Sequence, residues 1–332
     1  MTDNLLTVKN LTVRFNTAHG TQEALRDVSF SMFRGEALGI VGESGSGKSV
    51  TALSIMRLIP DPPGRITGGE INFLGRDLLK ESDGGMQDVR GNAVSMIFQE
   101  PMTSLNPLHT CGKQIMEPMI IHKNYSKGDA RERAIEYLGM VGIPSPKLRF
   151  REYPHQMSGG MRQRVMIAMA LVCGPKLLLA DEPTTALDVT IQAQILDLMK
   201  ELREKIDAGI IMITHDLGIV ADICDRVIVM YAGQVVESGL CSDIFKDPLH
   251  PYTQGLLFSI PRINDERKRL FSIEGMVPDP FETRRGCSFQ PRCGQRLPVC
   301  VEMAPDLFRA GEGREVRCWL YESETGGGDI GD

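Results

Sequence analysis

The strongest constraint on this chain is the order of three segments. A glycine-rich stretch at residues 42–49 comes first, a Ser-Gly-Gly turn at residues 158–160 opens a helical pattern, and an apolar run then ends in Asp181 and Glu182. Many phosphate-binding proteins share the first and third segments. The second supplies another helix N-terminus, whose free N–H groups bind anions. The order therefore predicts that two such domains bind ATP between them.

Composition indicates a globular chain with a main domain and an appendage. Of its 332 residues 42% are hydrophobic, which is enough for a buried core. Acidic residues outnumber basic ones, 43 against 37, and no Lys/Arg-rich block stands out, so nucleic acid is not expected as a partner. There is no apolar run of 18 residues and no signal-peptide pattern. We therefore expect a cytoplasmic protein that reaches a membrane only through a partner.

Alternating strand and helix patterns predict an α/β fold with a parallel sheet. Residues 105–150 have helical spacing, and past residue 239 the pattern thins and prolines recur, which predicts an irregular tail. Strands are expected at residues 37–41, 94–98, 177–180 and 210–214. The expected domains are residues 1–250, with a helical part at about 100–170, an extension at 251–325 and a disordered end at 326–332.

The glycine-rich stretch fits the phosphate-loop pattern G-x-x-x-x-G-K-S between an apolar strand and a helix. Its glycines let backbone N–H groups approach a phosphate, Lys48 neutralises phosphate oxygens, and the Ser49 hydroxyl binds Mg²⁺. A plain glycine-rich turn is the alternative. Phe15, on an earlier strand, either stacks on adenine or lies in the core. The loop residues expected to hold the nucleotide are Gly42, Glu43, Ser44, Gly45, Ser46, Gly47, Lys48, Ser49 and Val50.

Polar residues end three further strands of the expected sheet. Asp181 is expected to hold Mg²⁺ through water and Glu182 to polarise the attacking water, although acidic residues there can also be helix caps. Gln99 offers an oxygen to Mg²⁺ or water. His215 offers a neutral imidazole to the γ-phosphate, but a lone strand-end histidine is more often structural. The catalytic candidates are Glu182, His215 and Gln99, and the magnesium ligands are Ser49, Gln99 and Asp181.

The Ser-Gly-Gly turn is expected to act on a partner's nucleotide. Ser158, Gly159 and Gly160 present a hydroxyl and free N–H groups to an anion. Within one subunit this helix end cannot share the site built by Lys48, so we expect it to cap the γ-phosphate held by a partner domain. Asp188 is expected at the same seam, or else as a helix cap.

Four of the eight cysteines lie after residue 286, namely Cys287, Cys293, Cys300 and Cys318. Their gaps do not match the C-x-x-C spacing of a zinc knuckle. Four thiolates suit tetrahedral zinc or an iron–sulfur cluster, and reduced thiols in a packed tail are the third possibility.

In this order the motifs resemble the nucleotide-binding subunits of ABC transporters over residues 5–240, and finer features are similar to the dipeptide/oligopeptide importer branch. Those features are residues 99–107, 153–156, 181–188 and 250–253. The resemblance implies a P-loop ATPase domain with a RecA-like core, an antiparallel β subdomain and a helical subdomain, followed by a small Cys-rich extension. It implies a Walker A motif at residues 42–49, Q-loop Gln99, a signature at 158–160, Walker B Asp181 with catalytic Glu182, D-loop Asp188 and switch His215. Met157 and Met161 depart from the general L-S-G-G-Q pattern.

The resemblance further implies a function and a set of partners. ATP-driven closure of two such subunits would drive a permease that imports di- or oligopeptides. The implied partners are two membrane permease subunits, a second and paralogous ATPase, and an external peptide-binding protein, with this chain on the cytoplasmic face of the inner membrane. It also implies a [4Fe–4S] cluster at the four cysteines. Alternatives are a soluble ABC ATPase acting on ribosomes or nucleic acid, and a non-hydrolysing subunit, which would predict changes at Glu182 or His215.

Overall fold

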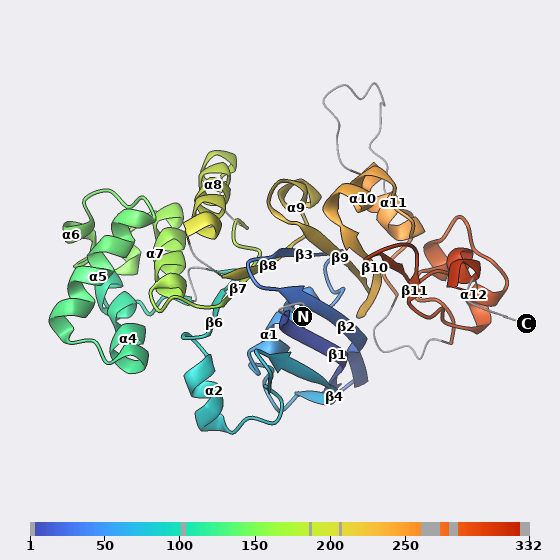
Figure 1. Cartoon of the computed structure of the whole chain (residues 1–332), viewed down its shortest axis with the longest axis horizontal. Helices are drawn as coiled ribbons and strands as arrows, with labels where there is room; N and C mark the ends of the chain where they lie inside the picture. The colour runs from blue at the N-terminus through green and yellow to red at the C-terminus, as the bar shows by residue number, and fades with distance from the viewer. Residues whose placement is uncertain are drawn as a thin grey trace, which may run out of the picture. The chain divides into compact units, whose positions relative to one another are not determined.

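The computed structural model describes residues 4–100, 104–185, 188–205, 208–259, 273–278 and 285–325. The chain forms two compact units, each assembled from segments that are far apart in the sequence (Figure 1). The first unit comprises residues 1–5, 32–37 and 73–213, and the second comprises residues 6–31, 38–72 and 214–332.

The first unit contains a parallel sheet whose strands carry residues 99, 181 and 182 at their ends. In the order β8-β7-β6, strand β7 pairs in parallel with both neighbours. Every residue of these strands is buried, as expected for a parallel sheet covered on both faces. The strands are β6 Val94–Ile97, β7 Leu177–Asp181 and β8 Gly209–Thr214, which confirms the predicted ones.

Helices α4, α5 and α7 of the first unit begin at capping residues. The side-chain oxygen of Thr110, Ser126 or Ser158 accepts a hydrogen bond from the backbone N–H group three residues later. This bond satisfies one of the N–H donors that have no partner in the first turn of a helix. Helix α7 packs against α4 and α5 (Figure 1), and α4 and α5 lie where the sequence has helical spacing. The elements are β5 Arg76–Asp77, α2 Asp83–Val89, α4 Cys111–Lys123, α5 Lys127–Met140, α6 Pro146–Arg149, η1 Pro154–Gln156, α7 Gly159–Leu171 and α8 Val189–Lys205.

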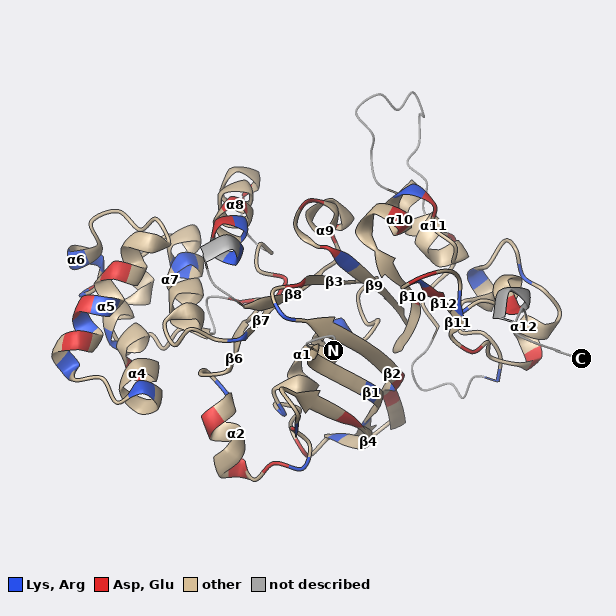
Figure 2. Ribbon diagram, viewed as in Figure 1, with Lys and Arg blue, Asp and Glu red and all other residues tan. Residues whose placement is uncertain are grey.

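Charged residues of both signs are interspersed along these helices. Figure 2 shows acidic and basic residues alternating on α5. There the Arg133 guanidinium lies 2.7 Å from the Glu136 carboxylate, and both side chains are about half exposed to solvent. Exposed pairs of this kind contribute only about 0.3–0.5 kcal/mol.

The second unit contains two sheets. Strands β2, β1 and β4 are adjacent in one, and in the other β9 pairs in parallel with β3 and antiparallel with β10. Residues 42–49 connect β3 to α1. The elements are β1 Asn4–Thr17, β2 Gly20–Phe33, β3 Ala37–Val41, α1 Lys48–Ile55, β4 Gly64–Phe73, α9 Leu217–Ile223, β9 Arg226–Tyr231 and β10 Gln234–Leu240.

The chain after residue 239 is more regular than the sequence predicts. Strand β12 pairs antiparallel with β10, through Val316 opposite Glu237, and β11 pairs with β12. The expectation of an irregular tail is wrong for residues 241–258, where Pro251 opens a helix at its first position instead of breaking one. Residues 285–318 consist mostly of turns and loops, as predicted. The elements are α10 Cys241–Lys246, α11 Pro251–Phe258, η2 Gln290–Arg292, α12 Val299–Glu302, β11 Phe308–Arg309, β12 Glu315–Val316 and η3 Trp319–Thr325. The predicted disordered end, residues 326–332, lies outside the described residues.

A buried carboxylate joins three segments of the second unit. Glu237, fully buried on β10, accepts the N–H groups of Leu249 and His250, each at 2.9 Å, and an Arg314 N–H at 3.0 Å. Burial lowers the pKa of His250 to about 3. The ring is therefore neutral, and its Nδ1 accepts the Tyr252 N–H at 3.0 Å, which caps α11.

Removing this carboxylate should destabilise the second unit. Glu237→Ala leaves two backbone donors and one Arg314 N–H group without their acceptor, although Arg314 keeps its contact with Asp247. We therefore expect a loss of about 3 kcal/mol in the free energy of unfolding. Urea denaturation followed by circular dichroism and by fluorescence of Trp319, the single tryptophan, measures it. Glu136→Ala is the control and should change stability by less than about 0.5 kcal/mol; equal losses in both variants would contradict the role of Glu237.

Candidate ATP-binding and hydrolysis site

The phosphate loop of the second unit needs glycine at three positions. Gly42, Gly45 and Gly47 have φ angles of 151°, 78° and 101°, which glycine adopts at little cost. Gly42 also lies directly against β9. A Cβ atom there would stand 2.2 Å from the Met230 carbonyl oxygen, so a side chain cannot be accommodated without moving the strand.

The polar groups of this loop fit a polyphosphate. Lys48 is 6% exposed, and its Nζ donates to the carbonyl oxygens of Gly42, at 2.8 Å, and Glu43, at 3.0 Å. The Ser46 hydroxyl is buried and has no hydrogen-bond partner among the described residues. The N-terminus of α1 follows at once. A cation, a buried hydroxyl and a helix N-terminus together favour an anion.

In the first unit, hydrogen bonds join the side chains of Glu182, Gln99 and Thr185 where β7 ends, beside Asp181. Asp181, the last strand residue, is buried. Glu182 follows with a φ of 45°, in the left-handed region that non-glycine residues rarely adopt. Its carboxylate accepts hydrogen bonds from Gln99 Nε2 at 3.0 Å and from Thr185 Oγ1 at 2.8 Å. Strained residues held this way concentrate at functional sites.

This geometry unites two of the three predicted catalytic residues, Gln99 and Glu182. Thr185 was not predicted, although a hydroxyl three residues after a carboxylate is a signal that could have identified it. Ser49 and Val50 lie in the first turn of α1. Their roles, like those of Glu43 and Ser44, stay predictions.

His215 and Phe15 both belong to the second unit. His215 is exposed after β8, just before Asp216, whose carboxylate caps α9 by accepting the Gly218 N–H at 2.8 Å. Phe15 is half-buried on β1, and its ring packs so closely on Gly64 that a Cβ there would stand 2.6 Å from it. Neither observation tests the predicted contacts with nucleotide.

The glycine-opened helix α7 exposes its N-terminus on the first unit. Ser158 Oγ accepts the Met161 N–H at 3.4 Å, and Ser158 and Gly159 are exposed. Gly160 faces α8, where a Cβ would stand 2.6 Å from Ile191. Asp188 is the cap of α8, because its Oδ1 accepts the Ile191 N–H at 2.9 Å. Its place at a dimer seam stays a prediction.

The four cysteines of the extension are predicted to hold a metal or an iron–sulfur cluster. Among the described residues no group of three or more His, Cys, Asp or Glu side chains is arranged to hold a metal ion, so the iron–sulfur prediction is not supported. The thiols are nevertheless neighbours. Burial raises the pKa of Cys318 to about 11, and the charges of Cys287, Cys293 and Cys300 add to the increase.

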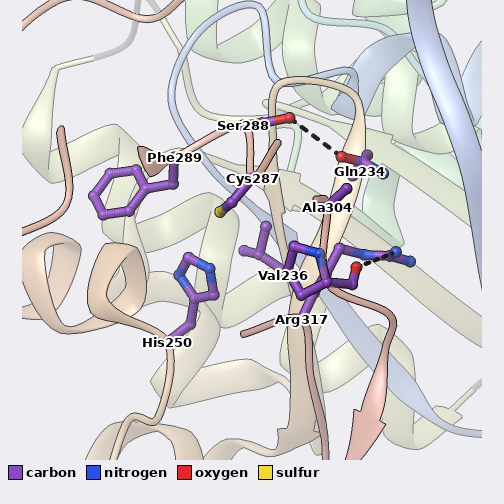
Figure 3. Close-up of a pocket in the computed structure, with 9 residues that line it drawn as sticks. Gln234, Val236, His250, Cys287, Ser288, Phe289, Ala304 and Arg317 are labelled. Carbon is purple, nitrogen blue, oxygen red and sulfur yellow. Dashed lines mark hydrogen bonds between the residues drawn. The ribbon is translucent and has the colours of Figure 1, made fainter. Parts of the chain in front are cut away.

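Cys287 also lines a small cavity (Figure 3). The Ser288 hydroxyl next to it bonds to Gln234 Oε1 at 3.3 Å, while His250 and Arg317 form other walls. Burial lowers the pKa of Arg317. The cavity volume of about 10 Å³ is near the smallest that holds a single water molecule.

The phosphate loop, the strand-end carboxylates and the glycine-opened helix define an ABC-type ATPase. A family model described as "ABC transporter" matches residues 25–185. A dimeric ATP-binding cassette, MJ0796, solved in a post-hydrolysis state with ADP and Pi, matches with a TM-score of 0.64 and 30% identity over 71% of this chain and 98% of that one.

The C-terminal part narrows the class further. Residues 236–300 match the model "Oligopeptide/dipeptide transporter, C-terminal region". The oligopeptide transport ATP-binding protein OppD of Bacillus subtilis is 54% identical over 97% of this chain and 90% of its own length. The dipeptide transport ATP-binding protein DppD of Escherichia coli is 50% identical over 97% and 98%. The chain belongs to this family of peptide ABC transporter ATP-binding subunits. No helix of the described segments is long and apolar enough to span a bilayer.

Lys48→Ala should abolish measurable ATP binding. The substitution removes the buried cation of the loop, so we expect affinity to fall by about 100-fold or more. Equilibrium displacement of a fluorescent ATP analogue by ATP measures this. Lys9→Ala, at an exposed position of β1, is the matched control. Retained affinity in the Lys48 variant would reject the assignment of the loop.

Proposed function

We propose that this chain binds and hydrolyses ATP to drive import of di- or oligopeptides through a membrane permease. The observation that carries the proposal is the carboxylate of Glu182, held by Gln99 and Thr185 beside the buried Asp181. The peptide cargo rests on the match of the C-terminal region and on relatives named for oligopeptide and dipeptide transport.

In the proposed reaction each residue has one task. Lys48 and the loop N–H groups bind the phosphates. Ser49, Gln99 and Asp181 are the ligands for Mg²⁺, which supplies charge neutralisation on the phosphoryl oxygens when bound. Glu182 takes up the proton of the attacking water, and the His215 imidazole orients the γ-phosphate and that water. Phe15 stacks on the adenine.

Two subunits act as a head-to-tail pair in this proposal. Ser158, Gly159 and Gly160 at the exposed start of α7 cap the γ-phosphate held by the partner ATPase. Asp188 lies at the seam. The dimeric state of the similar cassette bound to ADP and Pi supports the pairing of two subunits.

The proposed partners are two membrane permease subunits, a second and paralogous ATPase, and an external peptide-binding protein. The helical part of the first unit exposes Leu108 by 81%, Ile121 by 64% and Leu148 by 58%. We propose that the permease docks on this helical part, where these apolar side chains are accessible for contact. In this arrangement the chain is peripheral, on the cytoplasmic face of the inner membrane.

We further propose that the four cysteines of the extension are the ligands of a [4Fe–4S] cluster. The proximity of the four cysteines to one another supports this proposal. The other three thiols contribute to the raised pKa of Cys318, and the Cys287 N–H donates to the Cys300 carbonyl oxygen at 2.8 Å. Ligation requires thiolates, so the ligands must lose their protons on binding.

Glu182→Gln should bind ATP normally but hydrolyse it at least about 100-fold more slowly, because the amide cannot accept the proton of water. Phosphate release under saturating ATP, alongside ATP affinity, separates the two effects. Glu132→Gln, on the exposed face of α5, is the control. Unimpaired turnover in the Glu182 variant would remove this residue from the mechanism.

The partner proposal is tested by purifying the Glu182→Gln variant with ATP in mild detergent and identifying bound proteins by mass spectrometry. Two multi-span permeases and a second ATPase are expected. Ribosomes or nucleic acid in their place would favour the soluble ABC ATPase.

Cys293→Ser should strip iron from anaerobically purified protein. Elemental analysis for iron and zinc, with the visible absorption spectrum, measures it. Cys173→Ser, at a buried cysteine of the first unit, is the control. Iron content that is nil in the unmodified protein, or unchanged in the Cys293 variant, would contradict the cluster.

A further inference from the structure

Arg292, in the cysteine-containing segment, contacts the phosphate loop with both arms of its guanidinium. Its Nη1 donates to Glu43 Oε2 at 2.7 Å and its Nη2 to Glu43 Oε1 at 3.0 Å. Glu43 is the second residue of the loop, 249 positions earlier in the chain. This two-pronged geometry is specific to arginine, because a lysine ammonium cannot match both carboxylate oxygens.

The remaining donors of Arg292 are also used. Nε donates to the Glu274 carbonyl oxygen at 3.1 Å, Nη2 to that of Ile273 at 3.2 Å, and Nη1 to the Tyr231 hydroxyl at 3.4 Å. All five N–H groups of a guanidinium thus have acceptors. The side chain is only 4% exposed. A buried cation with every donor paired holds its position closely.

A second contact fixes the backbone of the same loop residue. The Glu43 N–H donates to the Tyr252 hydroxyl at 2.8 Å. Tyr252 is fully buried and makes tilted ring contacts with Tyr231, at a centroid distance of 4.6 Å, and with Phe289, at 5.4 Å. Phe289 precedes Arg292 by three residues in the same segment. The extension therefore binds both the side chain and the main chain of Glu43 by hydrogen bonds.

These contacts with Glu43 matter for nucleotide binding because Glu43 is negatively charged. A carboxylate within a phosphate-binding loop repels an incoming polyphosphate unless a cation neutralises it. Arg292 supplies that cation from outside the loop. A guanidinium is always charged near neutral pH.

We propose that the C-terminal extension is a clamp on the phosphate loop, in which Arg292 is a positioning residue that neutralises Glu43, while Tyr252 fixes the direction of the Glu43 N–H. Nucleotide affinity then depends on the extension, although the extension lies outside the phosphate loop in sequence. The clamp goes beyond the hydrolysis and transport proposed above and stands without them, since it concerns nucleotide binding alone.

The test is a double-substitution experiment on the full-length chain, with ADP binding measured by isothermal titration calorimetry with and without Mg²⁺. Arg292→Ala should weaken ADP binding about tenfold, because the Glu43 carboxylate would then repel the phosphates across a distance at which solvent screens the charges only in part. The loss should be larger without Mg²⁺, because the free nucleotide carries more negative charge. Adding Glu43→Gln to Arg292→Ala should restore most of the affinity, because it removes the uncompensated charge itself.

Two further variants distinguish the neutralisation of the Glu43 charge from an effect on the folding of the extension. Arg292→Lys keeps the charge and should bind ADP within a few-fold of the unmodified chain. Arg296→Ala removes a nearby exposed arginine that contacts Gln290 and not the loop, and should leave ADP affinity unchanged. Thermal unfolding of each variant shows whether the extension remains folded.

The clamp is overturned if Arg292→Ala binds ADP as tightly as the unmodified chain. It is also overturned if the loss persists after Glu43→Gln is added, because the arginine would then be only structural. Should Arg292→Ala not fold, Tyr252→Phe decides the question. It keeps the ring and removes the acceptor of the Glu43 N–H, so it should weaken ADP binding a few-fold; unchanged affinity would reject the clamp.

Discussion

The phosphate loop depends on the close approach of its backbone to β9. At Gly42 the main chain lies so near the Met230 carbonyl that no side chain fits. The far end of the loop is tied to the turn after β9, because the Gly233 N–H donates to the Ser46 carbonyl oxygen at 3.0 Å. Thr51 adds a hydroxyl bond to the Gly47 carbonyl at 3.0 Å. The loop is thus shaped by its neighbours before any nucleotide binds, which lowers the ordering cost of binding.

The C-terminal extension also holds the phosphate loop and its neighbouring strands in place. It bonds to β10 through Arg314 and Glu237, to the turn region through Ser288 and Gln234, and to the loop through Arg292. Arg26 of β2 also donates to both Ser288 and Gln234, each at 3.1 Å. Because these bonds are buried or half-buried, losing the extension would leave charged and polar groups without partners. The second unit therefore folds with the extension in place.

Local patterns in the sequence predicted the loop, the strand-end carboxylates and the helix starts. Each rests on a short motif or on periodicity, as in the apolar run before Gly42 or the capping Ser158. The contact between Arg292 and Glu43 could not be predicted this way, since it joins residues 249 positions apart and no local pattern encodes such a pair. The prediction of irregular structure around Pro251 was wrong for a different reason. A proline marks a helix start as readily as a break, and only the cap at His250 decides between them.

Glu182 shows how strain and hydrogen bonding combine at the hydrolysis site. Its left-handed backbone costs about 1–3 kcal/mol, and the Glu182 N–H bond to the Ile213 carbonyl at 2.8 Å helps to hold it. Gln99 uses its amide nitrogen on the Glu182 carboxylate, which leaves its oxygen as the atom suited to a cation or a water. Gln99 also directly precedes the segment that leads into the helical part. A displacement of Gln99 together with that segment would therefore move a hydrogen-bond donor of Glu182, the proposed general base.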